Sequence, residues 1–202
     1  MHQIISPSIL YLGTPVVLIS TLNEDGSANL APMSSAWWLG MSCMLGLGTR
    51  GKTFENLQRE KECVLNIPSI DMVDAVDRLA LTTGKNPVPD YKVKKNYRYD
   101  PHKFETAGLT PVASDVVKPP RAQECPIQLE ARVDHIYVLG DTEDHLSTVE
   151  VTILCTHVAD SLLNAEKRHH IDPDKWKPLI MNFLEFYGLG EKVHPSRLAE
   201  VF

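Results

Sequence analysis

The sequence predicts a mainly β protein with a mostly antiparallel sheet and a few short helices. Residues 15–22 are apolar and β-branched, and turn-forming residues at 23–26 follow them, which predicts a hairpin. Residues 127–139 and 146–158 form a second such pair around the turn residues 140–144. Because a tight turn joins antiparallel strands, whereas parallel strands need a long crossover, these patterns indicate an antiparallel arrangement.

Three further strands are expected in the first third of the chain. Residues 28–39 and 41–48 have the composition of a second and a third strand, and Gly40 supplies a turn between them. Residues 63–67 are typical of a buried strand, which ends at Pro68. Together with the first hairpin, these strands predict a meander rather than a parallel βαβ unit.

Two short helices and two less regular segments complete the prediction. The pattern favours a helix at 53–61, with Thr53 as its N-cap, and a second amphipathic helix from 71 to 81. A polar, basic stretch with three tyrosines follows, and we expect residues 71–106 to form a surface excursion. Residues 171–202 contain prolines and then apolar residues at near-helical spacing, so we expect this C-terminal segment to cover the sheet or a partner subunit.

Length and composition fit one globular domain over residues 1–202. The chain is 43% hydrophobic and 23% charged, which excludes disordered and collagen-like classes. A net charge of −6 gives no overall attraction for polyanions, so nucleic acid is not an expected partner. The first 49 residues carry only two charged side chains, Glu24 and Asp25. Serines, prolines and glycines interrupt this stretch, so burial in a sheet explains it better than a membrane span.

The cysteines and the N-terminal sequence predict a cytoplasmic protein. Cys43, Cys63, Cys125 and Cys155 match neither a CxxC pair nor a secreted disulfide framework, so we expect free thiols. No lysine or arginine precedes the first apolar stretch, and a signal peptide is therefore not indicated.

Residues 46–53 satisfy two phosphate-binding motifs at once. Their sequence, GLGTRGKT, fits the P-loop pattern GxxxxGKT, and its first six residues fit the dinucleotide pattern GxGxxG. Both motifs place a glycine-rich turn before a helix, where free amide N–H groups and the helix dipole attract an anion. Arg50 and Lys52, the first cations in the chain, lie there, so we expect an anion site. A P-loop nucleotide hydrolase remains one alternative, although an antiparallel hairpin precedes the motif.

A second polar feature lies at residues 29–38, NLAPMSSAWW. Pro32 cannot donate a ladder hydrogen bond, so this stretch is expected at a sheet edge or bulge with free backbone groups. Those groups and the hydroxyls of Ser34 and Ser35 suit the polar edge of a flat heterocycle, and a tryptophan suits its face.

These segments resemble one known family. The stretches TPVVLISTLNEDGSANLAPMSSAWW, TRGKTFENLQREKECVLNIP and KPPRAQECPIQLEARV, with the later HLSTVEV hairpin strand, are similar to the flavin reductase-like proteins of the FMN-binding split-barrel class. The resemblance covers residues 14–67 and 108–163. It implies a six-stranded antiparallel Greek-key split β-barrel with a few peripheral helices, which forms a homodimer and holds FMN near the subunit interface.

The resemblance also implies positions for the cofactor. The positions that match the family's contacts to the isoalloxazine and ribityl are Asn29, Ala31, Pro32, Met33, Ser34 and Ser35. Those that match contacts to the phosphate are Thr49, Arg50, Gly51, Lys52 and Thr53. The expected activity is transfer of electrons from NADH or NADPH through FMN to a small-molecule acceptor such as free flavin. A non-catalytic FMN-binding protein of the same fold is a further alternative.

No catalytic side chain or metal site is expected. Flavin chemistry does not demand a nucleophilic triad, because the isoalloxazine itself accepts and donates the hydride. His145 resembles a histidine of the family, but its place in a hairpin is more typical of an exposed structural residue. His169 and His170 are adjacent and lack cysteine or carboxylate partners at metal-ligand spacing.

Overall fold

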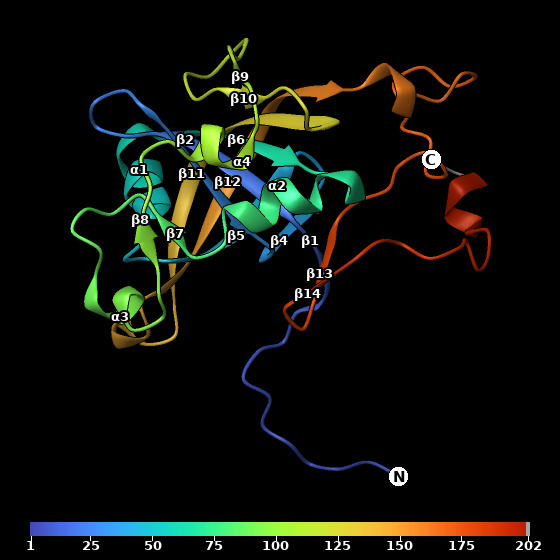
Figure 1. The fold of residues 1–202 in the computed structure, drawn as a ribbon. Coiled ribbons are helices and arrows are strands. Elements are labelled where there is room, and N and C mark those ends of the chain that lie inside the picture. The colour runs from blue at the N-terminus through green and yellow to red at the C-terminus, as the bar shows by residue number, and fades with distance from the viewer. Residues whose placement is uncertain (201–202) are drawn as a thin grey trace.

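The computed structural model describes residues 1–200, and its centre is one seven-stranded antiparallel sheet (Figure 1). The order across the sheet is β3-β2-β6-β11-β12-β5-β4. The strand bounds are β2 (Val17–Leu22), β3 (Ala28–Met33), β4 (Ala36–Leu39), β5 (Ser42–Gly48), β6 (Glu62–Ile67), β11 (Ile127–Leu139) and β12 (Leu146–Val158). The predicted mainly β, antiparallel class is therefore confirmed.

The strand count differs from the six expected because the predicted strand 28–39 is two strands. It breaks at Ser34 and Ser35, so β3 and β4 lie at opposite edges of the sheet although only two residues join them. The sheet must curl for so short a link to connect its edges. At the break, the Gly46 amide of β5 donates a 2.7 Å hydrogen bond to the Ser35 carbonyl. A Cβ on Gly46 would lie 2.9 Å from the Ser35 Cβ, so this approach requires glycine.

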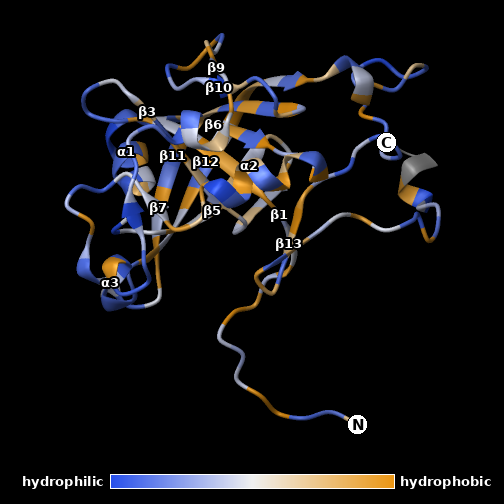
Figure 2. Ribbon diagram, in the orientation of Figure 1, coloured by the Kyte–Doolittle hydropathy of each residue, from blue (hydrophilic) through white to orange (hydrophobic). Residues whose placement is uncertain are grey.

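Alternation along the strands divides the apolar side chains between two clusters. On β2, Val17 and Ile19 point into the barrel and pack with residues of β5, β6, β11 and β12. Leu18 points the other way and packs with Leu30 and the helices outside the barrel. Figure 2 shows apolar residues concentrated in the strands of the barrel, whereas α2 carries both apolar and polar residues. This period of two follows directly from the pleat of a strand.

The remaining elements outside the large sheet are short helices and short strands. The helices are α1 (Lys52–Glu60), η1 (Ile70–Met72), α2 (Val73–Arg78), α3 (Asp90–Val93), α4 (Lys103–Ala107), η2 (Thr142–Asp144), η3 (Asp160–Leu162) and η4 (Arg197–Glu200). The short strands are β7 (Thr82–Thr83), β8 (Arg98–Tyr99), β9 (Pro111–Val112) and β10 (Arg121–Ala122). None of the helices in residues 1–200 has the length and apolar character needed to cross a bilayer.

The prediction of a surface excursion at 71–106 is wrong for much of that segment. Val76 and Leu79 of the first half and Phe104 of the second are buried in the outer cluster. Between them, β7 and β8 pair in parallel, and Thr83 is only 1% exposed. The segment is polar overall, yet several of its apolar residues pack in the outer cluster, whereas Leu81 and Val93 stay exposed.

The C-terminal segment forms strands rather than the helix that its spacing indicated. β13 (Ile180–Asn182) and β14 (Glu185–Tyr187) form a hairpin, and β13 pairs with β1 (Leu12–Pro15). Phe183 and Leu184 turn this hairpin with positive φ angles of 46° and 73°. Leu179 is buried in the outer cluster, so this part does cover the barrel. Residues 201 and 202 of the predicted covering segment lie outside the described residues.

A buried carboxylate fixes the loop that precedes β11. Glu130 of β11 has no exposed surface, and its oxygens accept hydrogen bonds from the amides of Asp115, Val116 and Val117 at 2.9, 2.7 and 3.2 Å. His157 Nε2 lies 2.7 Å from the same carboxylate. Burial raises the pKa of Glu130, but the hydrogen bonds outweigh this effect and hold its pKa below the ordinary value.

Glu130→Gln should lower the free energy of unfolding by about 1.5–3 kcal/mol at pH 7, because the amides lose a charged acceptor. Since the folded pKa of Glu130 is depressed, its contribution is present above the unfolded pKa of about 4.3 and disappears as the pH falls through the folded value. Urea unfolding from pH 7 to pH 3 should therefore show the two proteins converging. Glu191→Gln, on an exposed side chain, is the control, and a gap that stays constant with pH would contradict the assignment.

Candidate functional site

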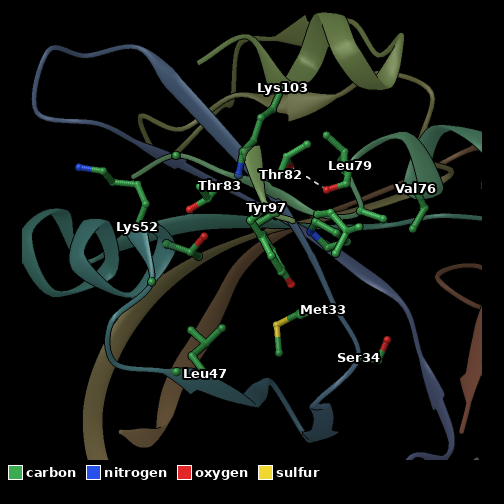
Figure 3. Close-up of a pocket in the computed structure, with 18 of the residues that line it drawn as sticks. Met33, Ser34, Leu47, Lys52, Val76, Leu79, Thr82, Thr83, Tyr97 and Lys103 are labelled. Carbon is green, nitrogen blue, oxygen red and sulfur yellow. Dashed lines mark hydrogen bonds between the residues drawn. The ribbon is translucent and has the colours of Figure 1, made fainter. Parts of the chain in front are cut away.

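A cavity of about 600 Å³ lies beside the free edge of β3 (Figure 3). This volume is within the range of roughly 300–1,000 Å³ that is common for small-molecule sites. One wall comes from the barrel and the start of α1, and the other comes from residues 76–103. The rest of the lining comes from the small sheet of β1, β13 and β14 and the residues next to its strands: Tyr11, Met181, Leu184 and Phe186.

The barrel wall contains four of the residues expected to contact the flavin ring: Ala31, Pro32, Met33 and Ser34. β3 pairs only with β2, so the backbone groups on its other edge are not used by the sheet. Pro32 is tolerated because it lies in an edge strand. The free edge at Pro32 and the Ser34 hydroxyl therefore lie along the same space as the apolar side chains of Met33 and Leu47.

The N-terminus of α1 forms one end of this wall, with Gly51, Lys52 and Thr53 in the lining. The predicted N-cap, Thr53, is wrong: Gly51 is the N-cap, and no side chain caps the helix. Thr53 instead accepts a 3.2 Å hydrogen bond from the Asn29 amide. First-turn N–H groups without a side-chain cap, and the positive end of the helix dipole, suit an anion.

Asn29 and Ser35, two further predicted contacts, support the cavity from behind. Asn29 is buried and links β3 to α1 through its hydrogen bond to Thr53. Ser35 donates a 3.1 Å hydrogen bond to the hydroxyl of Tyr11, which lines the cavity. Both side chains therefore position lining residues.

Thr49 and Arg50 lie at a neighbouring hollow of about 620 Å³, which they share with Tyr91 and Lys85. The guanidinium carbon of Arg50 stacks 4.2 Å from the centre of the Tyr91 ring. The Thr49 amide donates a 2.8 Å hydrogen bond to the carbonyl of His145. His145 thus acts through its backbone, with a positive φ of 54° at the end of η2. Because Tyr91 lines both spaces, the two hollows are neighbours.

The second wall was missed by the sequence analysis. It includes Leu79 to Gly84 and the side chains of Tyr91, Lys92, Tyr97 and Lys103. Gly84 packs so closely that a Cβ there would lie 2.8 Å from Asn29 Oδ1 and 3.0 Å from Lys52 Cγ. The available signal was the clustering of lysines and tyrosines in an acidic protein, which indicates a functional surface as readily as a solvated loop.

The lysines at the cavity differ in how their charge is balanced. Lys52 lies 3.6 Å from Glu24 and 3.7 Å from Glu55, and Lys85 also pairs with Glu55. Lys103 is only 4% exposed. Burial, followed by the charge of Lys92, lowers the pKa of Lys103 to about 8, while Asp100 acts in the opposite direction.

One group of potential metal ligands lies outside the cavity lining, on β11, β12 and the loop before them. Asp115, Glu130, Cys155 and His157 place one ligand atom each within 4.8 Å of the others. Both oxygens of Glu130 already accept backbone hydrogen bonds, and one also contacts His157. This arrangement is explained by anchoring of the 115–117 loop.

The structure does not support the P-loop alternative. β5, which precedes the motif, pairs antiparallel with β4 and β12. A P-loop instead follows a strand of a parallel sheet, and its glycine-rich residues form a loop around the phosphates. Here Gly46, Leu47 and Gly48 belong to β5, so they do not form such a loop.

Comparison with known proteins agrees with this geometry. Residues 10–171 match the flavin reductase like domain. The uncharacterized protein YdfE of Bacillus subtilis (strain 168) is 46% identical over 189 residues, covering 94% of this chain and 90% of that protein.

Two solved structures share the fold at lower identity. Flavoredoxin of Desulfovibrio vulgaris (Miyazaki F) has a TM-score of 0.79 at 22% identity, with 99% of this chain and 100% of that chain covered. Nitrilotriacetate monooxygenase component B from Bacillus cereus has a TM-score of 0.74 at 23% identity, with 93% and 89% covered. With a domain match that spans most of the sequence, the chain belongs to the flavin reductase-like family of flavin-binding oxidoreductases.

Proposed function

We propose that this protein binds FMN in the cavity beside β3, takes electrons from NADH or NADPH, and passes them to a small acceptor such as free flavin. The observation that carries the proposal is the cavity itself, which has a free strand edge along one wall and the start of α1 with Lys52 at one end. A flavin mononucleotide has the matching pattern, with a flat heterocycle joined through a ribityl chain to a phosphate.

The residues of β3 are proposed to hold the ring and the ribityl chain. The free edge at Pro32 and the hydroxyl of Ser34 are proposed to supply hydrogen bonds, and Ala31 and Met33 to contact the ring through their side chains. Ser35 and Asn29 hold Tyr11 and Thr53 in place behind this surface. Apolar lining residues, including Leu47 and Phe54, exclude water from the same space.

The phosphate is proposed to lie at the start of α1, near Gly51, Lys52 and Thr53, with Thr49 and Arg50 beside it. When bound, the isoalloxazine would supply the redox chemistry, because it can accept a hydride, which carries two electrons, from the nicotinamide and pass those two electrons to the acceptor. The chain's own contribution is binding and orientation, and no catalytic side chain is assigned. The four cysteines are all free thiols, which supports a reducing, cytoplasmic location.

Lys52→Met should weaken FMN binding at least tenfold and leave riboflavin binding almost unchanged. The variant loses a charge-assisted hydrogen bond to the FMN phosphate, worth about 1.5–3 kcal/mol. Riboflavin has no phosphate, so it makes no such bond in the wild type. Fluorescence titration of both flavins measures the ratio. Ser34→Ala should weaken both flavins alike, and Lys95→Met, at an exposed lysine, is the charge-matched control. Equal losses for FMN and riboflavin in Lys52→Met would reject the phosphate assignment.

Anaerobic mixing of the FMN-loaded protein with NADH or NADPH tests the reductase step. Loss of the visible flavin band within the mixing experiment, and its return on addition of free flavin or another oxidised acceptor, are the expected results. The two nucleotides are compared at equal concentration to identify the donor. A protein that binds FMN but is reduced by neither nucleotide would support the non-catalytic FMN-binding alternative.

We also propose a homodimer, because apolar side chains are exposed on the edge strand β4. Trp37 is 57% and Leu39 75% exposed, and Met41 follows in the next turn. An unpaired, apolar edge strand is prone to association unless a partner covers it.

Light scattering should give twice the 22.6 kDa chain mass, and Trp37→Glu should reduce the measured mass. Val116→Glu, at a side chain exposed to a similar extent, should leave the mass unchanged. A wild-type monomer at micromolar concentration would contradict the proposal.

A further inference from the structure

Lys103 is a buried cation that the proposed flavin contacts do not use. It begins α4, lines the cavity and reaches into it from the side opposite Met33 and Leu47 (Figure 3). Its side chain makes no hydrogen bond or ion pair with any residue between 1 and 198. Such burial is costly for an ammonium, because it removes most of the side chain from water without supplying a counter-charge.

Lys92 adds a second positive charge to the same wall. Its amino group donates a 3.0 Å hydrogen bond to Thr83 Oγ1 and lies 5.2 Å from the centre of the Tyr97 ring. Lys92 is also close enough to lower the pKa of Lys103 through repulsion between the two charges. No carboxylate of the described chain lies within 4.0 Å of either amino group.

The nearby carboxylates are already committed to other groups. Asp100 is buried and accepts hydrogen bonds from the His102 amide at 2.9 Å and the Thr106 hydroxyl at 2.8 Å. Glu55 pairs with Lys52 and Lys85. The two lysines at the start of α1 and after β7 are thus neutralised within the chain, whereas Lys92 and Lys103 are not.

We propose that Lys92 and Lys103, with the Thr83 hydroxyl, form an anion-binding subsite for a second ligand, a small planar organic acid that binds against the flavin. The proposal rests on the proposed function, which places the flavin along β3 and its phosphate at α1. The ligand's carboxylate or phosphate group supplies the missing counter-charge. The Tyr97 ring, which crosses the cavity between Lys103 and Met33, supplies an apolar surface for its planar body (Figure 3).

The test measures binding of benzoate and phenyl phosphate by isothermal titration calorimetry, with benzamide as the uncharged analogue. Wild-type protein should bind at least one of the anions at least tenfold more tightly than benzamide. Lys103→Met should lose that preference, and Lys92→Met should weaken it. Lys95→Met, an exposed lysine of the same segment, should behave as wild type. Anion binding to wild type no tighter than benzamide, or unchanged in Lys103→Met, would overturn the proposal.

A second measurement distinguishes this subsite from the flavin phosphate. FMN and riboflavin affinities of Lys103→Met should both match those of the wild type. A loss of FMN affinity alone would assign Lys103 to the flavin phosphate and overturn the second-ligand assignment. The calorimetry is performed on both flavin-free and FMN-loaded protein. A wild type that binds no flavin would contradict the proposed function, and the anion titrations of the flavin-free protein would still test the subsite.

Folding of the variant provides an independent readout. Removing an unpaired buried charge removes its desolvation cost, so Lys103→Met should melt at a higher temperature than the wild type without added anion. Benzoate or phenyl phosphate should then raise the melting temperature of the wild type and not that of the variant. A variant that is less stable than the wild type without anion would indicate that Lys103 is satisfied within the chain, which contradicts the proposal.

Discussion

The two-residue link between β3 and β4 is the constraint on which the rest of the structure depends. These strands occupy opposite edges of the sheet, so Ser34 and Ser35 can join them only if the sheet curls until its edges approach. Closure is local, through the Gly46 amide and the Ser35 carbonyl. Before this point, β3 runs with one edge unpaired, and the cavity forms along it. The same break that completes the barrel therefore creates the backbone surface that is proposed to bind a flavin.

The two buried charges, Glu130 and Lys103, differ in whether the chain supplies them with hydrogen-bond partners. Glu130 is surrounded by donors, since three amides and His157 point at its carboxylate, and its role is complete within the chain. Lys103 is also buried, with 4% of its surface exposed, but has no acceptor among the described residues. A satisfied buried ion is explained by the loop it anchors. An unsatisfied one that faces a cavity is explained by a group that enters that cavity.

The sequence predicted the regular parts of the fold because their patterns are local. The strands 127–139 and 146–158 have the observed bounds, since alternation and the turn between them determine both. The strand 28–39 was predicted without its break, because the break is required by sheet closure, a long-range condition. Thr53 was assigned as a cap from its type alone, whereas Asn29, distant in sequence, determines its hydrogen bond. The wall at 76–103 was missed for the same reason, since sparse apolar residues do not reveal which surface they will pack against.

Exposed and buried cations near the cavity have different effects on an anionic ligand. The chain carries a net charge of −6, yet Arg50, Lys85, Lys92, Lys94 and Lys103 gather around the two neighbouring hollows. A local positive field in an acidic protein attracts anionic ligands to the mouth while the remaining surface repels them, which raises the rate of productive encounter. Surface charges are screened over about 8 Å at physiological ionic strength, whereas buried ones are screened much less. Arg50 and Lys94 are thus suited to attraction at the entrance, and Lys103, mostly buried and unpaired, is suited to holding the ligand once water has been excluded.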